Sequence, residues 1–464
     1  MATSRGRITV ALGVATGLFA ATLPARAETI DATSTTLLAG HSDPRDGKTY
    51  TVVPVYEMVS LTAGDLRVPY IDDLRIQISG WGMAAFGNQG PTAAYPNPIS
   101  DNNGNPNCRG ANASLSDTAC ITGDLDLGNI EGRVAKRHIT FKLGRQFVVG
   151  GAARMTQLDG AALEFKFYKG LGLQLYGGAP VTPRFATSRG DAIGGGRVFY
   201  RHSVTTEVGA SAVYVLGAGR TAREDVALDA RYSPLPQISF TGYGLYSLYE
   251  MRIGEANLAV TAQPWRIFDI TADYRRIAPD LFLPRNSIFS VFSQETRDEA
   301  GVWFSIRPRG RTRIYGDYHA VVDDQGLGHR AGLKGSFAVA SQTTLGAEAR
   351  LLKLPDKGYL EGRLFGLQRL GEKVTITLDL DGLWLEQALN GRDYSLTAAA
   401  TVGWDFAPGW KTVVTAMGDV GPYVDGRLEV MAKLVYNHTY RFHESTPNVT
   451  PEPAKAESKA QVTP

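Results

Sequence analysis

The stretch KVTITLDLDGLWL, residues 373–385, alternates between two kinds of side chain. Apolar side chains recur at every second position, and polar or charged side chains lie between them: Val374, Ile376, Leu378, Leu380 and Trp384 against Lys373, Thr375, Thr377, Asp379 and Asp381. A period of two predicts a β-strand with one apolar face and one wet face. One such strand is weak evidence, because any half-exposed sheet shows the same alternation.

The same alternation recurs along most of the chain. It is clear at 225–232, 267–276, 299–307, 311–320 and 346–351, each time with charged residues on the polar face. Between Leu74 and Phe442 the pattern predicts about 20 strands, with a range of 16–22. Most of them reach the roughly 9–11 residues that cross a bilayer when a strand is tilted.

The connections between these strands alternate as well. Nine tight joins are expected, at 135–138, 167–172, 201–206, 232–237, 263–266, 307–312, 338–343, 367–373 and 406–411. The intervening connections include three longer, more polar ones, at 87–123, 179–194 and 277–294. Short turns at one end and longer loops at the other are typical of outer-membrane barrels.

We therefore predict an all-β chain that forms a closed antiparallel transmembrane β-barrel over residues 71–442, with short periplasmic turns and longer external loops. Its apolar faces would contact lipid, and its charged faces would line a water-containing lumen. The aromatic residues Trp265, Phe268, Phe406 and Trp410 fit an interfacial girdle or ordinary hairpin packing. A soluble all-β architecture stays open as the alternative, because opposed apolar faces produce the same alternation.

The two ends of the chain differ in composition from the rest. Residues 1–27 carry Arg5 and Arg7, a short apolar run, and Ala25-Arg26-Ala27 as a small-x-small cleavage site. This predicts a secretory signal peptide, with a membrane anchor as the alternative. Residues 28–70 are expected to form an N-terminal periplasmic segment, with 52–59 outside the barrel wall. The tail 443–464, rich in Pro, Ala, Lys, Glu and Thr, is expected to be disordered.

Charge and cysteine content exclude several classes of function. The chain has 48 basic and 46 acidic residues, so nothing favours binding to nucleic acid. Cys108 and Cys120 lie in one polar stretch, which predicts a local disulfide in an exported protein. Oxygen donors at 101–107 resemble calcium ligands but lack a spaced terminal Glu, which favours a solvated loop. No CxxCH haem site occurs, and we expect no cofactor.

Two stretches carry a resemblance to a known family. Leu143–Phe185 contains GRQ at the end of a strand and DG at the opening of the next, and Leu434–Phe442 ends on an aromatic residue as terminal barrel strands do. Both resemble porin-like outer-membrane β-barrel proteins. The resemblance implies the outer membrane of a Gram-negative-type envelope, contact with its lipid, and transport. Arg145, in phase with Leu143, is expected at the rim rather than in the lumen.

Candidate functional residues follow from the charged faces. The pore-lining candidates are Lys142, Glu164, Lys166, Asp229, Arg231, Asp269, Asp273, Arg275, Arg311, Arg313, Asp317, Glu348, Arg350, Asp379 and Asp381. Inward acids and bases nearly balance, so composition does not predict charge selectivity. The connection 178–196, with Arg184, Arg189 and Asp191, is the candidate constriction loop, and a plain surface loop is its alternative.

The leading hypothesis is a porin-like channel for passive diffusion of small hydrophilic solutes. A second is a structural barrel that docks or sheathes a partner protein, such as an electron-transfer cytochrome. A third is an outer-membrane hydrolase, for which His319 beside Asp317 is the best candidate. A plugged receptor would need more residues than 28–70 provide. No catalytic, cofactor-binding or metal-binding residue is predicted, and a homo-oligomer is left open.

Overall fold

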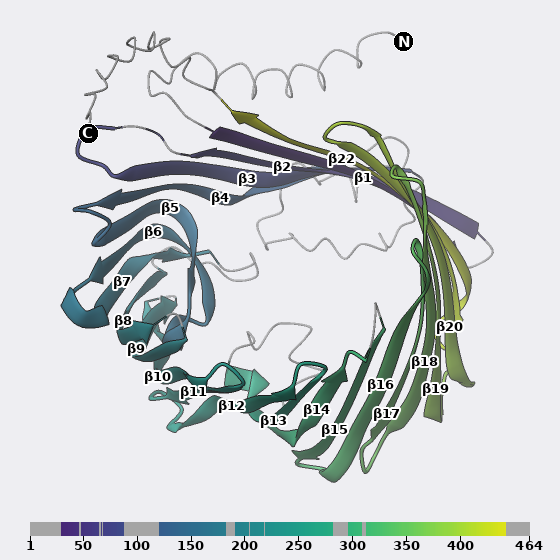
Figure 1. Cartoon of the computed structure of the whole chain (residues 1–464). Helices are drawn as coiled ribbons and strands as arrows, with labels where there is room; N and C mark the ends of the chain where they lie inside the picture. The colour runs from purple at the N-terminus through teal and green to yellow at the C-terminus, as the bar shows by residue number, and fades with distance from the viewer. Residues whose placement is uncertain are drawn as a thin grey trace, which may run out of the picture.

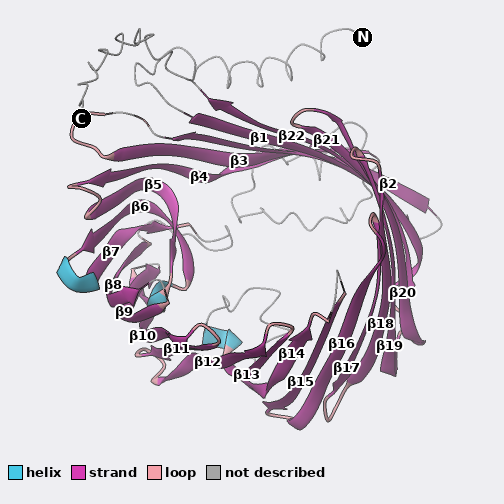
Figure 2. Cartoon of the chain, viewed as in Figure 1, coloured by secondary structure: helices cyan, strands magenta, loops and turns pink. Residues whose placement is uncertain are grey.

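The computed structural model describes residues 29–45, 48–64, 66, 68–87, 120–181, 191–203, 205–217, 219–281, 296–308 and 312–441. In this part the chain forms one 22-stranded sheet, in which each strand pairs antiparallel with the next along the chain. The first and last strands, β1 (Thr29–Arg45) and β22 (Val424–Arg441), also pair with each other, which closes the sheet into a barrel (Figures 1 and 2). Closure leaves no unpaired sheet edge, as a membrane-spanning sheet requires.

The remaining strands follow one another around the wall. They are β2 (Lys48–Gly64), β3 (Asp73–Gly87), β4 (Cys120–Val134), β5 (Ile139–Val149), β6 (Met155–Lys166), β7 (Leu171–Pro180), β8 (Ala192–Ser203), β9 (Thr206–Gly217), β10 (Arg220–Leu235), β11 (Ile238–Ser247), β12 (Arg252–Trp265), β13 (Phe268–Ile277), β14 (Arg297–Ile306), β15 (Arg313–Asp323), β16 (Gly326–Ala340), β17 (Thr343–Lys353), β18 (Gly358–Leu370), β19 (Val374–Leu389), β20 (Arg392–Ala407) and β21 (Trp410–Gly421). Three short 3-10 turns complete the described elements: η2 (Gly151–Ala153), η3 (Tyr168–Gly170) and η4 (Pro279–Leu281). Within the described residues, no helix has the length and apolarity needed to cross a membrane.

The connections divide between the two ends of the barrel. Thr29 and Arg441 are register partners, so both ends of the described chain lie at the same end of the barrel, here named the turn end. All nine joins predicted to be tight fall at the turn end. The opposite end, named the loop end, carries the three connections predicted to be long, now bounded by strands at 88–119, 181–191 and 278–296.

The N-terminal part of the barrel corrects the sequence-based expectation. Residues 28–70 were expected outside the barrel, but β1 and β2 pair with each other and with β22 and β3, so 52–59 lies in the wall. The prediction of about 20 strands is therefore short by one hairpin, within its stated range. An extra hairpin leaves the parity of the strand count unchanged, so the turn pattern alone does not reveal it. The first 28 residues and those from 442 onward, which include the predicted signal peptide and tail, lie outside the described residues.

The path of η2 identifies the inner face of the wall. This turn lies between β5 and β6 in the sequence, yet it packs against β9, β10 and β11. A connection of five residues reaches strands so far around the barrel only by crossing its concave side. Side chains that meet η2, such as Val213, Ala227 and Leu245, therefore point inward. Register partners on adjacent strands point to the same face of the sheet, so the inner face is assigned on every strand around the wall.

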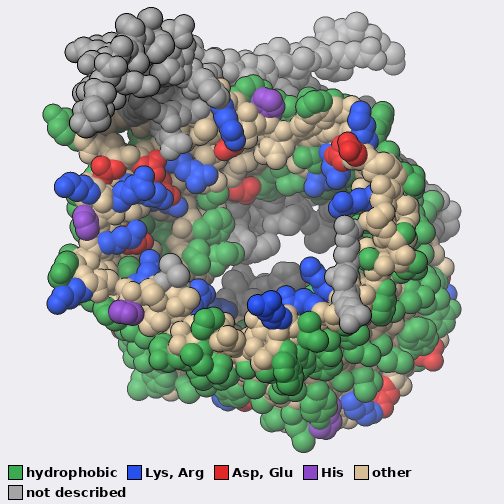
Figure 3. All heavy atoms as spheres, viewed as in Figure 1, with side chains coloured by type: hydrophobic (Ala, Val, Ile, Leu, Met, Phe, Trp, Pro, Cys, Tyr) green, Lys and Arg blue, Asp and Glu red, His purple; other side chains and the backbone are tan. Residues whose placement is uncertain are grey.

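The outer face carries the exposed apolar side chains. Along β19, Leu378 and Leu380 are 59% and 49% exposed and lie outside, whereas Asp379 and Asp381 share the inner face with Arg363 of β18. Figure 3 shows hydrophobic side chains over the outside of the wall and charged side chains beside the central opening. A closed barrel with an apolar outer surface and a charged interior is a transmembrane barrel of the outer-membrane type.

The aromatic residues at the turn end fit both roles considered for them, packing within a hairpin and lying in an interfacial girdle. Trp265 and Phe268 are neighbours across one hairpin, with ring centroids 5.8 Å apart, and Phe406 and Trp410 are 6.2 Å apart across another. Trp265 is also 66% exposed on the outside of the wall. These residues thus pack within their own hairpins and remain available to the membrane interface.

Arg145 lies on the outer face, where the pairing of β4 with β5 stops. The ladder between these strands runs from Val134↔Ile139 to Gly128↔Arg145 and goes no further. There Arg145 Nη1 donates to the carbonyl oxygen of Leu125 at 2.7 Å, and its Nε donates to Asp159 at 2.8 Å. Its phase agrees with the expectation that it does not line the lumen.

Candidate functional site: the lumen and its inner wall

The predicted pore-lining residues that are described all share the inner face. The register pairs place them there on strands all around the barrel: Lys142, Glu164, Lys166, Asp229, Arg231, Asp269, Asp273, Arg275, Arg313, Asp317, Glu348, Arg350, Asp379 and Asp381. Arg311 lies outside the described residues. The period of two is sufficient to place these side chains, because a strand in a closed wall has only two faces.

Several charges of the inner wall meet an opposite charge on another strand. Lys142 Nζ lies 3.2 Å from Glu131, Arg363 Nε donates to Asp379 at 2.8 Å, and Lys334 Nζ lies 3.2 Å from Glu348. Further pairs are Arg197 with Glu207 and Asp229, Arg307 with Asp269, and Arg330 with Glu299. Among the described residues, acids and bases are therefore interspersed over the inner wall, and neither sign dominates it.

The predicted constriction loop is largely outside the described residues. Arg184 and Arg189 lie in the segment 182–190, and Asp191 directly precedes β8. A different connection folds inward: residues 150–154, between β5 and β6. Its carbonyl and amide groups are held by side chains of strands on the other side of β8, namely Ser211, Arg223 and Tyr243. We call residues 150–154 the inner segment.

The inner segment has several polar anchors. Ser211 Oγ accepts from the Ala152 amide at 2.7 Å, Arg223 Nη2 donates to the Ala152 carbonyl at 2.8 Å, and Tyr243 donates to the Gly151 carbonyl at 3.1 Å. At its end, Arg154 Nε lies 2.8 Å from Glu255 of β12. These contacts satisfy the backbone groups that a buried irregular segment otherwise leaves unpaired.

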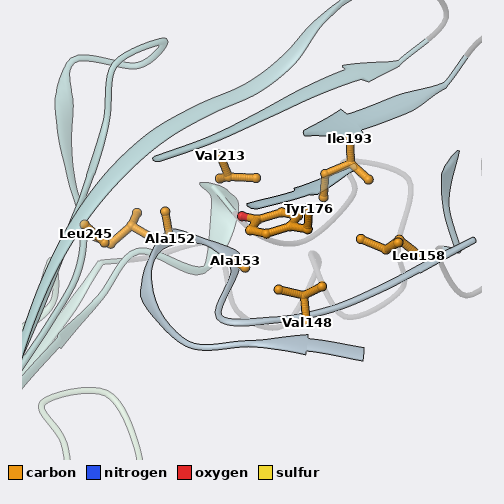
Figure 4. Close-up of a cluster of buried hydrophobic side chains, with 9 residues drawn as sticks. Val148, Ala152, Ala153, Leu158, Tyr176, Ile193, Val213 and Leu245 are labelled. Atoms are coloured by element: carbon orange, nitrogen blue, oxygen red, sulfur yellow. The ribbon is translucent and has the colours of Figure 1, made fainter. Parts of the chain in front are cut away.

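Apolar packing fixes the same segment to the wall. Ala152 and Ala153 are buried, and they share one cluster with Leu158, Val213 and other inward residues of β5 to β11: Val148, Tyr176, Ile193, Ala227 and Leu245 (Figure 4). A barrel wall rarely needs a core of its own, because its inner face is usually wet. Here the inner segment covers part of that face and excludes water from it.

Sequence reasoning missed the inner segment because it is short. The residues Gly150, Gly151, Ala152 and Ala153 offer no charge and no length to mark an inward fold. Their small side chains are nevertheless a usable signal. A Cβ added at Gly151, where φ is +54°, would lie 2.3 Å from Ser211 Oγ, so close approach to the wall requires glycine there.

His319, the candidate hydrolase residue, lies in a charged environment on the inner wall. It is 4% exposed; its Nε2 is 3.2 Å from Asp273 Oδ1, and its Nδ1 is 3.4 Å from Asp317 Oδ2 and 3.2 Å from Arg330 Nη2. In the described part of the chain its ring nitrogens therefore face carboxylates and a guanidinium, not a nucleophile. A Ser-His or Cys-His arrangement needs such a nucleophile within hydrogen-bond reach.

Two further predictions concern residues that the structure does not describe. Cys108 and the loop 101–107 lie within 88–119, and Cys120 is described only as the first residue of β4. The predicted disulfide and the preference for a solvated loop stay predictions.

Comparison with known proteins gives no family. No family model matches the chain, and no curated protein matches it. Among solved structures, the translocation pore of the P pilus usher PapC covers 89% of this chain and all of its own, at 10% identity and a TM-score of 0.45. Pseudomonas aeruginosa OccK5 (OpdH) covers 89% and 98%, at 9% identity and 0.42, and Acinetobacter baumannii OccAB4 covers 90% and 99%, at 8% identity and 0.40. At such identities and TM-scores these likenesses assign no function to this chain.

Proposed function

We propose that this chain is a passive diffusion channel for small hydrophilic solutes in the outer membrane. The observation that supports it is the charged inner wall of a closed 22-stranded barrel. A circular barrel of this strand number, with strands about 4.8 Å apart and tilted by roughly 40°, measures about 45 Å across its backbone. Side chains do not fill such a width, and barrels of 16–18 strands already hold an aqueous channel.

The charges themselves support a wet lumen. Ionised groups are costly in a dry interior unless each is paired and hydrogen-bonded. Arg350 is 52% exposed on its side chain, and Arg307 is 45% exposed, although both point inward. Water in the lumen accounts for exposed inward charges without further partners. In this proposal the turn end faces the periplasm and the loop end faces outward.

The strand number 22 also occurs in barrels whose lumen holds a plug. Residues 29–45 and 48–64, most of the described part of the N-terminal region, form β1 and β2 and therefore belong to the wall. They do not fill the lumen. Among the described residues, the inner segment covers only the part of the inner wall between β5 and β12, which supports a narrowed opening.

Planar-bilayer recording of the purified chain tests the proposal. We expect stable ion conductance with little preference for cations or anions, because acids and bases are interspersed among the described residues of the inner wall. Heat-modifiable migration and β-type circular dichroism in detergent establish that the sample is folded. Folded protein that never conducts would refute the channel and favour the barrel that docks or sheathes a partner.

A further inference from the structure

A hollow in the inner wall gathers charges of both signs around a glycine. Its volume is about 650 Å³, and it lies over β13 to β18, lined by Trp303, Asp317, His319, Arg330, Gly332 and Arg350, among others. The inner segment packs on β9 to β11, so it does not supply the lining of this hollow. We call this space the Gly332 hollow.

Gly332 forms the floor, and opposite charges stand on either side of it. The register pairs Gly332 with Asp317 on β15 and with Arg350 on β17, so the three residues form one row across the wall. Neighbouring strands are about 4.8 Å apart, so the two charged residues arise roughly 10 Å from each other. A Cβ at Gly332 would lie 2.4 Å from Asp317 Oδ1, so any side chain there would displace the carboxylate.

The Asp317 carboxylate keeps capacity for a further partner. Its Oδ2 lies 3.4 Å from His319 Nδ1 and 3.7 Å from Arg330 Nε, both longer than a good charge-assisted hydrogen bond. Arg330 meanwhile lies closer to Glu299, at 3.1 Å. A carboxylate has about four acceptor positions, so Asp317 is able to accept from a bound ammonium group.

Arg350 keeps donor capacity in the same way. Its side chain is 52% exposed, and it contacts Glu348 on its own strand and Glu361 on β18, the latter at 3.7 Å. Lys334 also neutralises Glu348, at 3.2 Å. A guanidinium has five N–H donors in a planar fork, which suits a carboxylate.

Trp303 supplies an apolar side to the hollow. It pairs with Asp317 across β14 and β15, so it continues the row beyond the carboxylate, and it is 38% exposed although it points into the lumen. An apolar group packed against this half-exposed indole removes apolar surface from water, which stabilises the contact.

We propose that the Gly332 hollow is a binding subsite for zwitterionic solutes of the α-amino acid type. The solute's ammonium group binds Asp317, its carboxylate binds Arg350, and its apolar side chain packs on Trp303. An anion without the ammonium is attracted by Arg350 but repelled by Asp317, and a cation without the carboxylate is attracted by Asp317 but repelled by Arg350, so both bind more weakly than the zwitterion. This inference rests on the proposed channel function, because solutes reach the inner wall through the lumen.

Ligand-observed NMR on the folded full chain in detergent tests the site with three matched probes. L-phenylalanine carries both charges, 3-phenylpropionate only the carboxylate, and phenethylamine only the ammonium. We expect phenylalanine to bind about tenfold or more tightly than either analogue, since a hydrogen bond to a charged group is lost in each. Equal binding of the three probes, or no binding of phenylalanine, overturns the inference. This comparison needs no variant and so does not depend on whether variants fold.

Variants then locate the site. Asp317→Asn and Arg350→Gln should each weaken phenylalanine binding by about tenfold, and Gly332→Ala should abolish it by filling the floor. The matched controls are Asp419→Asn and Arg427→Gln, an inward pair on β21 and β22 whose atoms lie 3.1 Å apart. Equal losses in the controls would show non-specific attraction to the lumen and overturn the subsite. Conductance separates the two proposals: conducting protein that does not bind phenylalanine refutes the subsite alone, and folded protein without conductance refutes the channel.

Discussion

Replacing Ala152 with glutamate should release the inner segment from the wall and raise the conductance of the channel. Ala152 is fully buried, and both its amide and its carbonyl are bonded to side chains of the wall. A glutamate at this position has no described route to water while the segment stays in place. The segment must therefore move, or the carboxylate must stay buried.

A comparison of free energies favours movement of the segment over burial of the carboxylate. Three hydrogen bonds and the Arg154–Glu255 ion pair hold the polar side of the segment, and at roughly 1 kcal/mol each they contribute about 4 kcal/mol. Burying a carboxylate without a partner costs several kcal/mol, and forcing the larger side chain into a packed cluster adds about 1–3 kcal/mol. The cost thus exceeds this polar anchoring, whereas the ladder bonds of the wall are not affected.

Single-channel recording in planar bilayers measures the outcome. The Ala152→Glu channel should show higher conductance than the wild type, with heat-modifiable migration retained. The matched control is Ala135→Glu, the same substitution in an exposed turn at the turn end, which should leave conductance unchanged. Unchanged conductance in folded Ala152→Glu protein would refute the view that the inner segment narrows the lumen.

Three further outcomes concern stability, all measurable by urea unfolding in detergent. Leu158→Ala, which empties a fully buried position, should cost about 2–5 kcal/mol, and a cost below 1 kcal/mol would mean that the cluster is loosely packed. Arg145→Leu should cost about 3 kcal/mol, because it leaves Asp159 without its guanidinium partner on the outer face and the Leu125 carbonyl without its donor, and Arg145→Leu/Asp159→Leu should recover only the part due to Asp159; no recovery would contradict the pairing. Gly144→Ala should cost about 1–3 kcal/mol, because φ is +107° and the new Cβ would lie 2.2 Å from the Gly128 carbonyl oxygen; an unchanged midpoint would argue against this backbone.

The wall was predictable where its two faces differ strongly. In β19 the alternation of Leu378 and Leu380 with Asp379 and Asp381 identifies both the strand and its two faces. Apolar side chains face lipid, and charged side chains face water. The turns between such strands were predictable for the same reason, since each marks where the alternation restarts. All nine predicted tight joins lie at one end of the barrel.

The first hairpin escaped prediction although 52–59 is strand-like, because an even set of strands starting near Leu74 already places the tight turns and the end of the last strand together. On β1 and β2 the outward positions include Ser34, Thr36 and Glu57, and both hydroxyls donate to the Glu57 carboxylate. These polar side chains satisfy one another, and other outward positions, such as Val55, Val59 and Leu61, keep the outer face of β2 largely apolar. Alternation alone therefore identifies a strand here but does not say whether it joins the wall.

The inner segment and the Gly332 hollow could not be predicted from the sequence, for a different reason. Periodicity places a side chain on a face, but it does not say which strands become neighbours across the lumen or where a connection folds. Asp317 and Arg350 are 33 positions apart in the chain, and only the register of β15, β16 and β17 sets them on either side of Gly332. Likewise, only the closed wall brings Ala152 beside Ser211.

The GRQ and DG residues of the porin-like stretch have a structural role that follows from closure. A membrane barrel must bond every backbone group of its wall, yet the ladder between β4 and β5 stops at the Gly128↔Arg145 pair. At that point side-chain donors, in place of backbone amides, bond the backbone carbonyl oxygens. Arg145 donates to the Leu125 carbonyl, and Asn129 Nδ2 donates to the Arg145 carbonyl at 3.2 Å. Asp159 neutralises the arginine from the next strand, 2.8 Å away. Arginine and aspartate are thus placed on an otherwise apolar face because the wall opens there, and their charge stabilises the seam instead of lining the pore.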